Sequence, residues 1–196
     1  RCLVGGVDAR TDPPFVKAAA HLFQLRMIDN PVGLSPGEAA AFFLVERESD
    51  SQRSGYAPLL RVGGAWSLRE STHLLDEHIA PSGAALAEVV GAALAELALE
   101  GHRSPWLLGD HNGTSRRATE WAHALVRLRR KYDVDPRSTW FPATSFGDVG
   151  AASSAVAICC VARAHERGYA KHGSALVWSS SEGGGKAAIT LVAARA

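Results

Sequence analysis

The sequence has few cysteines and no excess of charge, and both shortages exclude classes of protein. The three cysteines, Cys2, Cys159 and Cys160, show no C-x-x-C spacing. Neither a disulfide framework nor a zinc site is therefore expected, and a reducing, cytoplasmic compartment fits best. Lys plus Arg number 21 and Asp plus Glu 20, which gives a formal net charge of +1. This balance offers no electrostatic footprint for nucleic acid or for an anionic membrane.

Long apolar runs and targeting signals are missing as well. No apolar run reaches the roughly 18 residues that a membrane span needs, and the first residues lack the pattern of a signal peptide. The chain opens on Arg1 instead of Met and enters the apolar run 2–7 at once. Its 196 residues, 46% of them hydrophobic, suffice for one core but not for two roomy domains. We therefore expect a part of a longer protein.

What is present is an alternation of apolar strands and helices. Strand-length apolar runs predict strands at 2–7 (buried on both faces), 38–46, 56–66, 106–108, 139–141, 175–179 and 187–193. Helical spacing and end signals predict helices at 15–26, 82–100, 115–132 and 151–167. The polar stretches 47–55 and 67–81 are predicted loops. This order favours an α/β layered domain.

Alanine is abundant, with 34 of the 196 residues, and the predicted helix 151–167 consists mostly of small residues. A helix faced with Ala and Ser can approach its neighbours closely, because the interaxial distance depends on the side chains at the contact. This composition suits a buried helix sandwiched between two sheets. The alternative is an Ala-rich composition with no such role.

The first candidate site is the loop 110–114, because α/β folds place their sites at strand ends. His111 could be a general base or an oxyanion donor there, with Asp110 orienting it. The alternative is that Asn112 and Gly113 form a turn and that Thr114 or Ser115 caps the following helix.

Two further loops are candidates for the same reason. In the stretch 145–152, Asp148 could be an acid or a base, or it could supply negative charge to a helix N-terminus. The stretch 180–186 is too glycine-rich for an ordinary hairpin connection unless the glycines have a role. Its glycines could cradle an anion with their N–H groups, but the stretch lacks the spacing of a P-loop.

Other polar residues are weaker candidates. His73 and His78, with Asp76 and Glu77 between them, could bind a metal but are more typical of a solvated loop. Adjacent cysteines inside an apolar helix behave as small hydrophobic residues. No cofactor and no metal site are predicted.

Taken in order, these segments resemble the C-terminal half of a β-ketoacyl synthase, one of the condensing enzymes of the thiolase fold. LSPGEAAAFFLVE is similar to that family's PGEGAAFLVLE segment, and LVGGVDA resembles the strand after the nucleophile-bearing helix. DHNGT falls at the HGTGT motif, TSFGDVGAAS at GHTLGAAG, and SSSEGGGKAAITLV at GFGGTNAALVL. The resemblance implies a thiolase-like layered fold (αβαβα when complete) with a mixed sheet. Residues 1–55 would end the N-terminal half and 56–196 would form the C-terminal half.

The resemblance also implies that the catalytic positions have changed. The family's two histidines hold the thioester carbonyl or activate the decarboxylating malonyl group. Alignment on Gly113 and Thr114 places Asp110 at the first histidine, with His111 one position late. Asp148 falls at the second histidine.

The glycine loop Glu182, Gly183 and Gly184 departs from the family as well, since Glu182 replaces the gatekeeping Phe. Lys186 replaces the Asn that follows this loop, and Ala143 falls near the position of the usual lysine. The nucleophilic Cys would lie upstream of Arg1.

Such changes bear directly on activity. Neutral imidazoles can donate hydrogen bonds to an oxyanion, whereas an ionised aspartate would repel it unless burial raised its pKa. The resemblance thus implies a ketosynthase-like protein of fatty-acid or polyketide synthesis, an acyltransferase if active, with altered or lost catalysis. Its partners would be an acyl-carrier protein or a coenzyme A thioester and the N-terminal half of the fold, in a homo- or heterodimer. The alternatives are an inactive subunit of the chain-length-factor type and an unrelated α/β binding protein.

Overall fold

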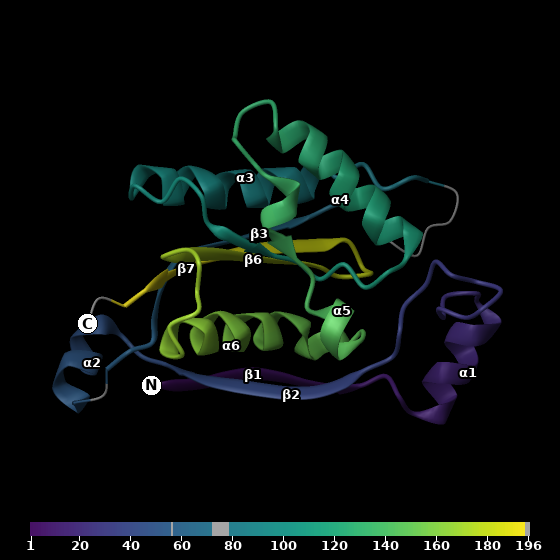
Figure 1. Ribbon diagram of the computed structural model, residues 1–196, viewed down its shortest axis with the longest axis horizontal. Coiled ribbons are helices and arrows are strands. Elements are labelled where there is room, and N and C mark those ends of the chain that lie inside the picture. The colour runs from purple at the N-terminus through teal and green to yellow at the C-terminus, as the bar shows by residue number, and fades with distance from the viewer. Residues whose placement is uncertain (56, 72–78, 195–196) are drawn as a thin grey trace.

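Sheets and helices are stacked in layers in the computed structural model (Figure 1), which describes residues 1–55, 57–71 and 79–194. The larger sheet has five strands in the order β3-β7-β6-β4-β5. Its strands are β3 (Leu60–Arg69), β4 (Trp106–Leu108), β5 (Thr139–Trp140), β6 (Ser174–Ser180) and β7 (Gly185–Ala193). β7 pairs antiparallel with β3 and β6, whereas β4 runs parallel to β5 and β6. The predicted mixed sheet is therefore confirmed.

Two helices, α3 (Ala84–Leu99) and α4 (Ser115–Leu128), cover one face of this sheet (Figure 1). The largest core cluster lies between them and the sheet and includes Val90, Leu97, Leu128, Leu176 and Trp178. Gly101, predicted to follow the C-terminal end of the first helix, has a φ of +88°. This left-handed conformation suits glycine, which has no Cβ to clash.

The other face of the sheet is covered by the small-residue helix α6 (Ser153–Glu166), which follows the short elements α5 (Ala143–Phe146) and η2 (Gly150–Ala152). Ala157 and Val161 of α6 pack against the larger sheet in a cluster with Leu108 and Leu191. On the opposite side Val156 packs in a cluster with β2. The helix therefore lies between two sheets, as its composition predicted (Figure 1).

The second sheet is an antiparallel ribbon of β1 (Cys2–Ala9) and β2 (Glu38–Val45), with Leu3 opposite Leu44 and Gly5 opposite Phe42. Its inner face lies over α6 and its outer face is apolar and exposed: Leu3 is 68%, Val7 67%, Phe42 54% and Leu44 57% accessible. The prediction that strand 2–7 is buried on both faces is wrong for this structure. The run is apolar on both faces, but the described residues cover only one of them.

Some elements differ from those that the sequence predicts. Helix α1 (Pro13–His21) ends before the predicted Arg26, because Phe23 adopts a positive φ of 52°. The predicted loop 47–55 contains the helix α2 (Glu48–Ser54), whose first turn carries two acidic residues that favour a helix N-terminus. Strand β3 continues beyond Trp66 to Arg69, with a register shift between Val62 and Ala65 at its two glycines.

The remaining short element is the 3₁₀ turn η1 (Pro136–Ser138). No helix in the described ranges is both long enough and apolar enough to cross a membrane.

Candidate functional site

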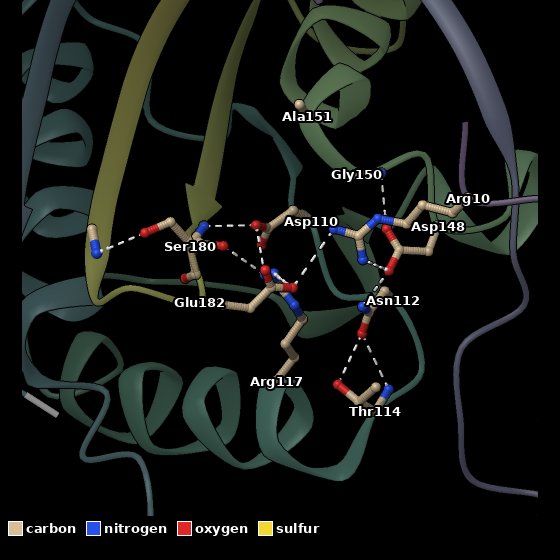
Figure 2. Close-up of polar contacts among 12 residues, drawn as sticks. Arg10, Asp110, Asn112, Thr114, Arg117, Asp148, Gly150, Ala151, Ser180 and Glu182 are labelled. Carbon is tan, nitrogen blue, oxygen red and sulfur yellow. Dashed lines mark hydrogen bonds and ion pairs between the residues drawn. The ribbon is translucent and has the colours of Figure 1, made fainter. Parts of the chain in front are cut away.

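The three polar loops singled out in the sequence converge at one end of the five-stranded sheet (Figure 2). Asp110 follows β4, Glu182 lies in the turn between β6 and β7, and Asp148 lies in the loop before α6. The fold thus brings together side chains that lie 38 and 34 positions apart. They are joined through two arginines, Arg10 and Arg117, into one network of ion pairs.

Asp110 is bound from two directions. One of its carboxylate oxygens, Oδ2, accepts hydrogen bonds from the backbone N–H of Ser180 at 2.6 Å and from Arg117 at 2.7 Å. Arg117 also donates to the carbonyl oxygen of Ser180 at 2.9 Å. Burial raises the pKa of the Asp110 carboxyl, although Arg117 and the Ser180 N–H favour its ionised form. Burial alone would lower the Arg117 pKa, but the carboxylates of Asp110 and Glu182 hold it above its usual value.

Asp148 is 5% exposed and is held just as firmly. Its Oδ2 accepts hydrogen bonds from Arg10 at 2.9 Å and from the Asn112 amide at 2.7 Å. Its Oδ1 accepts from the backbone N–H of Gly150 at 3.0 Å, at the start of the segment that leads into α6. Asp148 therefore both accepts from a backbone N–H just before helix α6 and forms an ion pair with Arg10.

Glu182 is the loosely held member of the network. Its Oε1 lies 3.7 Å from a nitrogen of Arg10 and 3.7 Å from a nitrogen of Arg117, and its side chain is 45% exposed. The turn that carries it is a hairpin connection, in which Ser180 pairs with Lys186. Gly184 makes this connection possible, because it has a φ of +87°.

The loop 110–114 is ordered around Asn112. Its side-chain oxygen accepts from the N–H of Thr114 at 3.2 Å and from the Thr114 hydroxyl at 2.9 Å. Thr114 occupies the N-cap position of α4, but its side chain does not cap the helix. Gly113 has a φ of +101°, and a Cβ on it would lie 2.3 Å from the carbonyl oxygen of Gly33. The turn predicted at Asn112 and Gly113 is present, while capping by the Thr114 hydroxyl is not.

His111 contacts an aromatic side chain. Its ring lies edge-on to Phe141, with the centroids 5.1 Å apart, and its Nδ1 accepts from the N–H of Gly113 at 3.4 Å. Burial and the nearby Arg117 lower the His111 pKa. The lowered pKa favours the neutral imidazole, which packs against Phe141.

A second, fully buried ion pair lies next to this network. Lys186 is 1% and Glu120 2% exposed, and their charged ends are in direct contact. The charge of Glu120 acts on Asp110 and contributes to its raised pKa. Lys186 of β7 thus has an ion-pair partner on α4.

Little space is left between these side chains. The cavity bordered by Asp110, Asn112, Asp148 and Trp178 has a volume of about 10 Å³, which is the room that one water molecule requires. The described residues contain no cluster of three or more His, Cys, Asp or Glu arranged to hold a metal. His73, Asp76, Glu77 and His78 lie outside the described residues.

Arg10, Arg117 and Glu120 complete the site but carry no signal in the sequence, and Asn112 is predicted only as a turn residue. Arg10 follows a strand and Arg117 lies in the first turns of a helix, where charged residues are ordinary. Only the fold shows that each arginine meets a carboxylate more than three residues away in sequence, and Arg10 meets one 138 positions away.

Comparison with known proteins identifies the fold. No family model and no curated protein matches the sequence. Solved structures do match it. The ketosynthase from module 6 of the bacillaene synthase of Bacillus subtilis 168 superposes with a TM-score of 0.81 at 16% identity, over 99% of this chain and 41% of that chain. The fold is that of a β-ketoacyl synthase.

Two further ketosynthase structures agree. The ishigamide ketosynthase/chain length factor matches with a TM-score of 0.78 at 21% identity, over 97% of this chain and 53% of that chain. A type II polyketide ketosynthase, solved with its acyl-carrier protein, matches with a TM-score of 0.76 at 16% identity, over 98% and 56%. The chain thus spans about half the length of these ketosynthases. The thiolase-like fold of the prediction is confirmed, and an unrelated α/β fold is excluded.

Proposed function

We propose that this chain belongs to a ketosynthase-like protein that has lost decarboxylative condensation and serves as a non-catalytic subunit of the chain-length-factor type. The observation that carries the proposal is the pairing of both aspartates at the motif-equivalent positions with arginine. Asp110 binds Arg117 at 2.7 Å and Asp148 binds Arg10 at 2.9 Å.

This pairing conflicts with the chemistry of condensation. An oxyanion is stabilised by donors aimed at the place where its charge develops. Burial raises the pKa of Asp110, but its carboxylate still accepts from Arg117 and from the Ser180 N–H, which favour the ionised form. Asp148 likewise accepts from Arg10, so the guanidinium N–H groups nearest to both aspartates are bonded to their carboxylates. The small cavity beside them holds about one water, which leaves no room there for an acyl chain.

The partners proposed for this protein follow from the fold and its apolar surface. One of the matching ketosynthases was solved with an acyl-carrier protein, and we propose a carrier protein or a coenzyme A thioester as the acyl-bearing partner here. The exposed outer face of the β1–β2 ribbon is apolar at Leu3, Val7, Phe42 and Leu44. Such a patch is typical of an interface, and we propose that the N-terminal half of the fold, residues 1–55 being its end, covers it. A homo- or heterodimer would then assemble from complete folds.

The test is acyl transfer to the protein in its full natural length. The protein is incubated with an acyl thioester or with a cerulenin-type inhibitor, and intact-mass spectrometry then looks for an adduct. The proposal expects no adduct on any cysteine, while an active ketosynthase treated in parallel is labelled. An adduct on a cysteine would overturn the loss of catalysis and support an acyl-transferring enzyme of fatty-acid or polyketide synthesis instead.

A further inference from the structure

The carboxylates around Arg10 and Arg117 are not held equally tightly: Asp148 and Asp110 are hydrogen-bonded, whereas Glu182 lies farther away and Asp8 is 3.9 Å from Arg10. Arg10 and Arg117 each bind one aspartate tightly, through a single terminal nitrogen, at 2.9 and 2.7 Å. The other terminal nitrogen of each arginine points at the same atom, Oε1 of Glu182, at 3.7 Å (Figure 2). Charge-assisted hydrogen bonds between guanidinium and carboxylate are about 2.7–2.9 Å long. The Glu182 carboxylate therefore lies between the two arginines without a full hydrogen bond to either.

Exposure separates Glu182 from the two aspartates. Its side chain is 45% exposed, against 13% for Asp110 and 6% for Asp148. It stands on a turn whose next two residues are glycines, and a Cβ on Gly183 would meet only Ser181 Oγ, at 3.9 Å. The carboxylate of Glu182 can therefore leave for solvent, while the two aspartates stay and hold the arginines in place.

We infer that the two guanidinium groups form a binding site for a ligand carboxylate, and that Glu182 is an internal occupant which the ligand displaces. A ligand carboxylate would approach from the solvent side and accept one hydrogen bond from each arginine. The planar fork of arginine suits this recognition better than a point charge does. Exchange of one carboxylate for another leaves the charge of the network unchanged. This inference does not depend on the proposed loss of catalysis.

The experiment titrates the chain with sodium acetate at constant ionic strength, with sodium chloride making up the difference. Binding is followed by ¹H–¹⁵N NMR at the Nε–H groups of Arg10 and Arg117 and at the backbone of Gly183. Removal of the internal competitor in Glu182→Gln should tighten acetate binding by about fivefold, because an occupied site lowers apparent affinity by its free fraction. The matched control is Glu88→Gln, which removes the same charge at an exposed position of α3 and should bind acetate as the unaltered chain does.

Two variants test the arginines without leaving the aspartates unpaired. Arg10→Lys and Arg117→Lys keep the positive charge beside Asp148 and Asp110 but lose the second nitrogen, so each should weaken acetate binding severalfold. Unchanged binding in Glu182→Gln overturns the inference, and so does unchanged binding in both lysine variants. Inorganic phosphate serves as the competing anion. If phosphate binds Glu182→Gln more than about tenfold tighter than acetate, a difference of 1.4 kcal/mol, the assignment to a carboxylate ligand is overturned.

Discussion

Ion pairs with little exposure to solvent hold single residues in place at this end of the sheet. Lys186 and Glu120 show this most clearly, since both are almost fully buried and their charged groups touch. Burial of an ion removes its hydration, and only a close partner compensates for the loss. Asp110 and Asp148 follow the same rule with Arg117 and Arg10.

Replacement of one member of the buried pair should therefore be severe. Lys186→Met leaves the Glu120 carboxylate buried without a cation, and we expect a loss of about 3–5 kcal/mol in the free energy of unfolding. The double variant Lys186→Met/Glu120→Leu removes both charges and should recover most of that loss. Urea unfolding followed by circular dichroism measures both values. Equal losses in the single and double variants would show that the pair is not what stabilises this region.

The acidic residues of the site could be predicted from the sequence, whereas the arginines that bind them could not. Asp110, Asp148 and Glu182 follow strands or precede a helix, so their loops could be predicted from local patterns. Their partners could not, because Arg10 and Arg117 lie in segments whose charge has an ordinary explanation at the surface. A long-range ion pair leaves no periodic or motif signal, since neither partner constrains its own neighbours in sequence.

Among the elements, helix α6 depends most on its small side chains. Ala157 is 3% exposed and packs against the larger sheet, while Val156 one residue earlier packs in the cluster of the ribbon. A bulky residue on either face would push a sheet away, because protein interiors have few voids.

Ala157→Leu should accordingly destabilise the chain by about 1–3 kcal/mol, the usual range for overpacking. Ala98→Leu, at an exposed position near the end of α3, is the matched control and should change stability by less than about 0.5 kcal/mol. Denaturant unfolding of both variants at one pH provides the comparison. A loss no greater in Ala157→Leu than in the control would contradict close packing of α6 between two sheets.

Element boundaries show where local signals suffice. The strands 106–108 and 187–193 and the helix 151–167 were predictable because their apolar or small residues must be buried in any compact fold. The helix at 48–54 was missed, because its polar residues resemble a loop and a one-sequence pattern offers no apolar face there. The end of α1 was missed because a positive φ at Phe23 reflects the path of the following chain, not the residue itself.

At the scale of the whole molecule, the β1–β2 ribbon leaves an apolar face without cover from the described residues. Phe42 and Leu44 lie on this face beside Leu3 and Val7, each more than half exposed. Apolar surface of this kind associates in water, since its burial releases free energy in proportion to area.

We expect the 196-residue chain to self-associate through this face when it is studied alone. Phe42→Lys/Leu44→Lys should lower the concentration-dependent association seen by sedimentation velocity, with little change in unfolding, because both side chains are largely exposed. Val126→Lys/Leu99→Lys places the same two charges on exposed apolar positions of α4 and α3 and should leave association unchanged. Equal effects of the two changes would show that charge alone, and not this face, governs association.

The sequence by itself determined the layered α/β class and the buried small-residue helix, because apolar periodicity and side-chain size act locally and in every compact arrangement. It also determined which loops stand at the strand ends. The tertiary structure alone decided that two arginines pair with the aspartates of those loops, that Glu182 lies between the arginines, and that the described residues cover only one face of the ribbon. These outcomes depend on distances between residues far apart in the chain, and Coulomb forces between buried charges depend strongly on those distances.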